Sequence, residues 1–232
     1  MKIRLLALSC ALYPLASCST IHTGTASGSA AQPAPQMPTA SEVIARLKQG
    51  NRRFATHHQK HPDQNGKRIH QLATGQHPIA CILACADSRV PPEIIFDQGL
   101  GDLFVVREAG HVADDATQGS LEYALEHLKT PVIVVLGHES CGAVTAALDV
   151  TDAHQRAEGE VQKLVEDIRP AILKVGKHGS HDDRVARGVT ENVKLVIRQL
   201  YRDPMITEAL KKGTVKIIGG VYDLHTGRIT WL

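Results

Sequence analysis

The chain contains two polar motifs, Cys85-Ala86-Asp87-Ser88-Arg89 and His138-Glu139-Ser140-Cys141-Gly142. Each directly follows a short apolar run, residues 79–84 before the first motif and residues 131–137 before the second. Short runs that are rich in β-branched residues and bounded by Pro or Gly predict buried strands. Ligands bind at the carboxyl ends of strands in open α/β sheets. Two adjacent parallel strands would therefore bring Cys85, His138 and Cys141 together.

Two thiolates and one imidazole are a ligand set that suits zinc, and three protein ligands leave a fourth position for water. His138 and Cys141 stand three residues apart at a strand-to-helix turn, so both can face one ion. Asp87 and Arg89 follow Cys85 closely, and a guanidinium can hold a carboxylate in a bidentate pair. The pattern predicts a catalytic zinc site with an Asp–Arg pair beside it.

Two structural alternatives exist for these residues. An Asp-x-Arg sequence after a strand is often only a structural salt bridge, and Cys85 could form a disulfide with Cys141. The disulfide would leave His138 and Asp87 without a purpose, so we prefer the zinc interpretation. Cys81 lies too far along the same strand to pair with Cys85, and we expect it to be a small buried core residue.

The paired motifs C-x-D-S-R-V and G-H-x-x-C-G resemble those of the β-class carbonic anhydrases. The resemblance spans residues 41–232 and includes Gly50-Asn51-Arg52-Arg53-Phe54, residues 91–110 and Gly219-Gly220-Val221-Tyr222-Asp223. It implies reversible hydration of carbon dioxide to bicarbonate and a proton, in which hydroxide bound to Zn²⁺ attacks carbon dioxide. One Zn²⁺ is expected per chain. It also implies an α/β fold with a mostly parallel sheet of about four strands plus an edge strand, flanked by helices, and a homodimer or homotetramer.

The resemblance also assigns roles to individual residues. Cys85, His138 and Cys141 would hold the zinc, and Asp87 would accept a hydrogen bond from the attacking hydroxide. Arg89 would orient Asp87 and keep it ionised; in a resting state Asp87 would itself occupy the fourth zinc position. Gln98 is the nearest match to a substrate-binding glutamine, although its offset differs by one residue and an ordinary loop residue is the alternative. Gly142 would let the backbone approach the substrate closely.

Two positions depart from the family pattern. The turn Glu108-Ala109-Gly110-His111 stands where the family often has an Ala-Gly-Asn turn. Ile82 stands where some bacterial members have a tryptophan that helps form an inhibitory bicarbonate site, although Arg107 and Tyr222 match its other members. We do not expect that regulation in the same form.

The length of 232 residues allows one domain plus extensions. Hydrophobic residues make up 43% and aromatics 3%, so Val, Ile, Leu and Ala must form most of the core. The formal charge of +2 does not indicate a nucleic-acid partner.

Strands alternate with helices along the chain, which predicts a parallel sheet. The predicted strands are 79–84, 103–106, 131–137, 215–222 and an edge strand at 228–232; the helices are 41–54, 67–75, 117–129, 140–148, 160–175, 182–201 and 205–212, with a helical turn from 91.

Histidines are abundant outside the two motifs. His57, His58 and His61 form a cluster in a polar stretch, without a Cys or carboxylate at ligand spacing, which favours a solvated loop. We expect the others, His111 among them, to be surface or loop residues.

The first 18 residues resemble a bacterial lipoprotein signal peptide. Lys2 and Arg4 precede an apolar stretch, Leu5–Ala16, that is too short to span a bilayer. Its end, Leu15-Ala16-Ser17-Cys18, would make Cys18 the lipidated first residue of the mature chain. Residues 19–40 predict a flexible tether before the zinc domain of residues 41–232. We expect an exported periplasmic or cell-envelope protein, held to a membrane through lipid only; a signal cleaved without lipid is the alternative.

Two other functions use the same residues. Enzymes that hydrolyse carbon disulfide or carbonyl sulfide share the zinc ligands, and only their substrate tunnel and an assay separate them. A non-catalytic zinc-binding lipoprotein would need no Asp87–Arg89 pair, so the presence of that pair argues against it.

Overall fold

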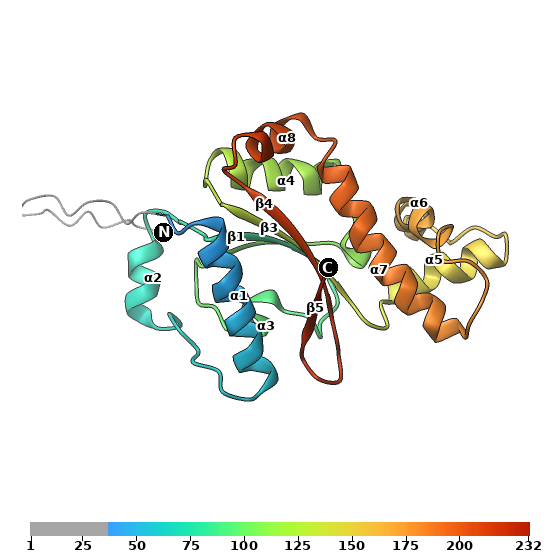
Figure 1. Ribbon diagram of the computed structural model, residues 1–232, viewed down its shortest axis with the longest axis horizontal. Coiled ribbons are helices and arrows are strands. Elements are labelled where there is room, and N and C mark those ends of the chain that lie inside the picture. The colour runs from blue at the N-terminus through green and yellow to red at the C-terminus, as the bar shows by residue number, and fades with distance from the viewer. Residues whose placement is uncertain (1–36) are drawn as a thin grey trace, which may run out of the picture. The chain divides into compact units, whose positions relative to one another are not determined.

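The computed structural model describes residues 37–232, which are built on a five-stranded sheet with the strand order β2-β1-β3-β4-β5 (Figure 1). Four strands are parallel, and β5 runs antiparallel to β4, as predicted. Every residue of β1 and β3 is buried, which explains why these central strands appear in the sequence as unbroken apolar runs. The strands are β1 (Ala80–Ala84), β2 (Leu103–Arg107), β3 (Val132–His138), β4 (Lys216–Tyr222) and β5 (Ile229–Trp231).

Helices pack on both faces of the sheet and confirm the predicted alternation. Side chains of α4 and α8 share one core cluster, whereas α1, α5 and α6 contribute to the other, and α7 contributes to both. The helices are α1 (Ala40–Ala55), α2 (Gly66–Leu72), α3 (Pro92–Ile95), α4 (Asp115–Glu126), α5 (Gly142–Asp152), α6 (Val161–Ile172), α7 (His181–Leu200) and α8 (Pro204–Lys211), with a 3-10 turn, η1 (Ala109–His111). Among residues 37–232, no helix is both long enough and apolar enough to cross a membrane.

Helix α1 begins earlier than the sequence suggests. Its N-cap is Thr39, whose hydroxyl accepts the Glu42 N–H at 3.3 Å while the Glu42 carboxylate accepts the Thr39 N–H at 2.8 Å. This reciprocal capping box needs a Glu three residues after the cap. The buried Asn51 then ties α1 to the end of the chain, because it donates to the Gly227 carbonyl at 2.8 Å and accepts from the Ile229 N–H at 3.0 Å.

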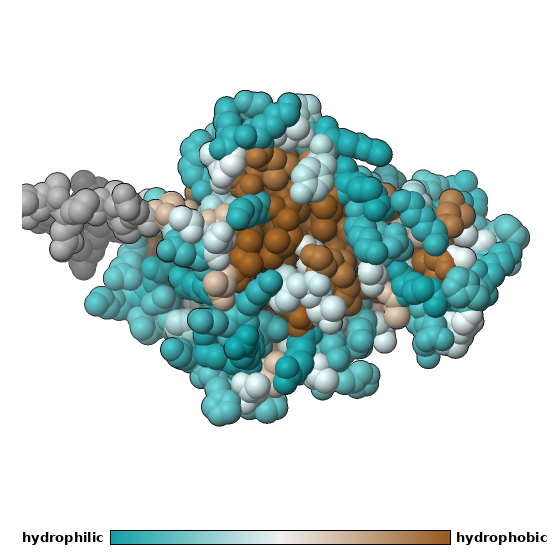
Figure 2. All heavy atoms as spheres, viewed as in Figure 1, coloured by the Kyte–Doolittle hydropathy of each residue, from teal (hydrophilic) through white to brown (hydrophobic). Residues whose placement is uncertain are grey.

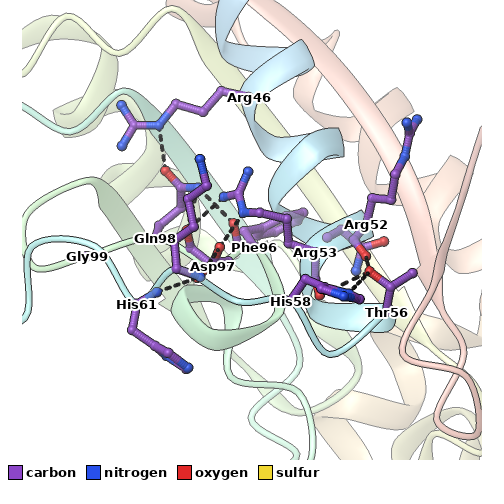
Figure 3. Close-up of polar contacts among 12 residues, drawn as sticks. Arg46, Arg52, Arg53, Thr56, His58, His61, Phe96, Asp97, Gln98 and Gly99 are labelled. Carbon is purple, nitrogen blue, oxygen red and sulfur yellow. Dashed lines mark hydrogen bonds and ion pairs between the residues drawn. The ribbon is translucent and has the colours of Figure 1, made fainter.

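A buried carboxylate, Asp97, organises the loop after α1 (Figure 3). It accepts hydrogen bonds from Arg53 Nε at 2.5 Å, from the Lys60 N–H at 3.0 Å and from the His61 N–H at 3.0 Å. The loop that carries the histidine cluster is therefore held through its backbone. Among residues 37–232, the histidines of this loop do not belong to any group of side chains close enough to share a metal ion.

Candidate metal centre

Three predicted ligands converge where β1 and β3 end. These strands pair in parallel with Ala84 opposite Leu136, so Cys85 and His138 emerge at the same edge of the sheet. Cys141 follows as the N-cap of α5. The ligand atoms of Cys85, His138 and Cys141 all lie within 4.8 Å of one another, and all three residues are buried. The predicted convergence is confirmed, and it depends on β1 and β3 being neighbours.

The histidine is prepared to bind a cation. His138 Nδ1 lies 2.8 Å from the Glu139 carbonyl oxygen, which can only accept, so Nδ1 carries the proton. Nε2 therefore presents a lone pair, and it is buried without a hydrogen-bond partner among the described residues. An orphaned lone pair beside two thiols is the donor set that zinc prefers.

The two thiols have different local environments. The pKa of Cys85 is lowered to about 3, first by the hydrogen bond from the Cys141 thiol and then by His138 and the amides of Asp87 and Gly110, while burial opposes the shift. The pKa of Cys141 is raised, by the same hydrogen bond to Cys85 and by burial. Cys85 and Cys141 are not joined in a disulfide in the structure, and Cys81 is also free. Cys81 lies in the core as predicted, and burial raises its pKa to about 12. This arrangement favours a cation that both sulfurs can share.

Beside the ligands, Asp87 is held by Arg89 in a bidentate pair. Arg89 Nε lies 2.9 Å from Asp87 Oδ1, and Arg89 Nη2 lies 2.7 Å from Oδ2. The hydrogen bond from the guanidinium keeps the pKa of Asp87 well below its ordinary value. Asp87 Oδ2 lies 3.8 Å from His138 Nε2, so an ionised carboxylate stands next to the predicted metal position.

Arg107 has a structural role that the sequence did not reveal. It pairs with Ala84 in register on the neighbouring strand β2. Its Nε donates to the Cys85 carbonyl at 2.9 Å and its Nη2 to the Asp87 carbonyl at 2.5 Å. The guanidinium therefore fixes the backbone of the turn that carries both a ligand and the carboxylate. An arginine at the end of a predicted strand was the available signal.

Three expectations need correction or remain open. His111 is not a surface residue, because its side chain is fully buried beside the metal centre; it lies in the turn η1 and is not part of the ligand group. Gln98 is buried and exchanges hydrogen bonds with Arg46 and with the Phe96 and Asp97 carbonyls, none of which belongs to the ligand cluster (Figure 3). Its role in substrate binding stays a prediction, as does that of Gly142, where an added Cβ would face open space among the described residues.

Comparisons with known proteins agree with this geometry. The family described as carbonic anhydrase matches residues 80–229. A carbonic anhydrase of Mycolicibacterium smegmatis is 45% identical over 196 residues, which cover 83% of this chain and 94% of that protein. Carbonic anhydrase 2 of Mycobacterium tuberculosis is also 45% identical, over 83% of this chain and 93% of its own length.

The chain belongs to the β-class carbonic anhydrase family. The β-carbonic anhydrase of Coccomyxa has the same fold, with a TM-score of 0.67 and 26% identity over 85% of this chain and 87% of that one. A tetrameric β-carbonic anhydrase of Sordaria macrospora has a TM-score of 0.65 and 27% identity, over 82% and 97% of the two chains. The chain is therefore a zinc-dependent lyase that reversibly hydrates carbon dioxide.

Proposed function

We propose that Cys85, His138 and Cys141 hold the zinc with which this enzyme hydrates carbon dioxide, and that Asp87 and Arg89 are the working pair beside it. The observation that carries this proposal is the convergence of two thiols and an unpartnered imidazole nitrogen in one buried cluster. A zinc ion with three protein ligands supplies a Lewis acid that brings the pKa of its water towards about 7.

Asp87 orients the nucleophile. An ionised carboxylate can only accept hydrogen bonds, and Arg89 keeps this one ionised. The proton of the attacking oxygen then points at Asp87, which leaves a lone pair free to face carbon dioxide.

Arg89 restrains the carboxylate. Both Asp87 oxygens are engaged by its guanidinium, and its own Nη2 also reaches the Ser140 carbonyl at 3.4 Å. Asp87 Oδ2 lies 3.8 Å from His138 Nε2, so if Arg89 released it, Asp87 would be near enough to take the fourth ligand position on the zinc, which is the resting state expected from the sequence. The bidentate pair supports the active arrangement, in which Arg89 holds Asp87 and the carboxylate does not bind the metal.

The test is stopped-flow carbon dioxide hydration, with the zinc content measured on the same sample of the purified chain. We expect one zinc per chain and rapid turnover. Zinc without carbon dioxide turnover, combined with hydrolysis of carbon disulfide or carbonyl sulfide, would instead assign the site to the sulfur analogues. A chain without zinc would overturn the ligand assignment.

We also propose that the enzyme assembles with a second copy of itself. Figure 2 shows an apolar area in the middle of one face, over the sheet beside β4, and β5 pairs with only the last part of that strand. Ile217, Ile218 and Val221 of β4 remain partly exposed, and the chain ends at Leu232, which is 50% exposed. The Sordaria macrospora relative is described as tetrameric.

Sedimentation of two leucine variants tests this assembly. Leu232→Glu places a charge at the apolar area and should yield monomers. Leu173→Glu changes a leucine of α6's C-terminal end that is 70% exposed, and it should leave the assembly intact. A monomeric wild-type chain would contradict the proposal.

We further propose export to the periplasm or cell envelope with a lipid anchor on Cys18. Residues 1–36, and therefore Cys18, lie outside the described residues, so the support is the signal-like pattern of the sequence alone. Several acyl chains anchor a protein firmly, whereas one binds marginally. Wild-type protein should gain acyl mass and fractionate with membranes, and Cys18→Ser should do neither. A wild-type chain without added mass would contradict lipidation.

A further inference from the structure

We propose that Asn192 of α7 is a positioning residue for the metal centre, acting through the turn η1 on the Cys85 thiolate. This inference rests on the proposed zinc site and extends it to a residue on a helix that supplies no ligand.

The turn η1 directs a backbone donor at the metal ligand. The Gly110 N–H donates to Cys85 Sγ over 3.3 Å, in a buried environment. A hydrogen bond to a thiolate stabilises its charge and restricts where the sulfur can sit. The position of this one amide therefore bears directly on one of the three ligand atoms.

The conformation of η1 is unfavourable for its sequence. Gly110 and His111 both have positive φ, 71° and 46°, in consecutive positions. Glycine adopts this region readily, but histidine pays a penalty for it. Such a conformation persists only where the surroundings hold it in place. The backbone supports the base of the turn: the His111 N–H donates to the Glu108 carbonyl at 2.8 Å, the Ala86 N–H donates to the same carbonyl at 3.2 Å, and the Glu108 N–H donates to the Ala84 carbonyl at 3.1 Å. None of these three bonds holds the Gly110 carbonyl or the His111 side chain.

Asn192 supplies the external support. It is 1% exposed, and its Nδ2 donates to the Gly110 carbonyl at 2.8 Å. The same Nδ2 lies 3.2 Å from His111 Nε2. The two protons of one amide nitrogen are thus available for the two residues with positive φ. This arrangement requires His111 Nε2 to be an acceptor, and therefore a neutral imidazole; burial lowers the pKa of His111 to about 4, which is consistent with that form.

The packing leaves η1 little room to move. A Cβ on Gly137, the residue before the ligand His138, would come within 2.8 Å of Val193 Cγ2 and 3.2 Å of His111 Cε1. A Cβ on Gly110 would come within 2.6 Å of Ile168 Cδ1. The glycines therefore allow α7 and α6 to approach the strand end and the turn closely. Within this close packing, the Asn192 amide holds the Gly110–His111 peptide through its carbonyl and so restrains the Gly110 backbone, whose N–H is directed at Cys85 Sγ.

The experiment compares three variants of the full chain with wild type. Asn192→Ala removes both N–H groups and leaves space, whereas Asn192→Leu removes them and fills the space. Val196→Ala, one turn further along α7, opens a cavity at another fully buried position but leaves the amide in place. We measure zinc dissociation into a competing chelator, and the thiolate-to-cobalt charge-transfer band after substitution with Co²⁺.

Both Asn192 variants should lose zinc about 10- to 100-fold faster than wild type, the range typical for partners of metal ligands. Their charge-transfer band should move to lower energy, because Cys85 loses a hydrogen bond. Val196→Ala should match wild type in both measurements even if its melting temperature falls. Asn192 variants with wild-type dissociation rates and spectra would overturn this inference alone, whereas a wild-type chain without zinc would overturn the proposed site as well.

Discussion

Asp87 and Asp97 are each paired with an arginine, but their carboxylates have different surroundings. The Asp97 side chain is 1% exposed, and it accepts from two backbone amides in addition to Arg53 (Figure 3). The Asp87 side chain is 17% exposed, and all its hydrogen bonds come from Arg89, a side chain that is itself 52% exposed. The first pair is enclosed by the loop it organises, and the second stands at the rim of the metal centre.

The difference separates a structural carboxylate from the one that we propose to be catalytic. Asp97 connects α1, the following loop and the segment after α3, so its acceptor capacity is used by the fold. Asp87 Oδ2 makes one hydrogen bond, to Arg89, and lies near His138 Nε2, so it can still accept from a bound nucleophile. The same Asp–Arg pairing thus organises a loop in one place and, as we propose, orients a nucleophile in the other.

The largest effect should come from Asp87→Asn. The amide has nearly the same shape, but it loses the charge and can present an N–H to the nucleophile. We expect kcat/KM for carbon dioxide hydration to fall by about 100- to 1,000-fold, with zinc content and melting temperature near wild type. Stopped-flow assays and metal analysis check this, and retained activity would rule out the proposed role of Asp87.

Arg89→Lys should produce a smaller loss. Lysine keeps the charge but cannot form the bidentate pair, so Asp87 is no longer held in one orientation. We expect kcat/KM to fall by about 10- to 100-fold. Arg184→Lys is the matched control, because Arg184 also forms a bidentate pair, with Asp152 on α5, away from the ligands. Equal losses in the two variants would indicate a general structural effect.

Asp97→Asn should affect stability instead of chemistry. Losing a charged acceptor in a buried site costs about 1.5–3 kcal/mol of unfolding free energy. Urea unfolding followed by circular dichroism measures this loss, and the activity of the folded fraction should stay near wild type. A variant of full stability would show that Asp97 does not organise the loop after α1.

The predictable parts of the molecule were those encoded in consecutive residues. The apolar runs before Cys85 and His138 indicated buried strands, and the soft ligands after them indicated zinc, because both signals are local. The Thr39 capping box was also local, but the predicted helix begins at residue 41, two residues after the cap.

The parts that escaped prediction depend on packing between distant segments. Arg107 binds the turn after β1 only because β1 and β2 pair with Ala84 opposite Arg107. Asn192 reaches Gly110 only because α7 packs at the end of β3. A single sequence shows neither the register of the strands nor the position of a helix, so it did not predict that His111 is buried.

The smallest predicted effect is the pH dependence of the stability that Asp97 contributes to the folded protein. Burial raises the pKa of Asp97, but hydrogen bonds from the Lys60 amide, Arg53 and the His61 amide outweigh it and lower the folded-state pKa. An unfolded aspartate has a pKa of about 3.9. The stabilisation is therefore fully present above that value and is lost as the pH falls through the lower folded-state pKa. The difference in melting temperature between wild type and Asp97→Asn should accordingly narrow between about pH 7 and about pH 3. A constant difference across that range would mean that the loop is held by the shape of the side chain and not by its charge.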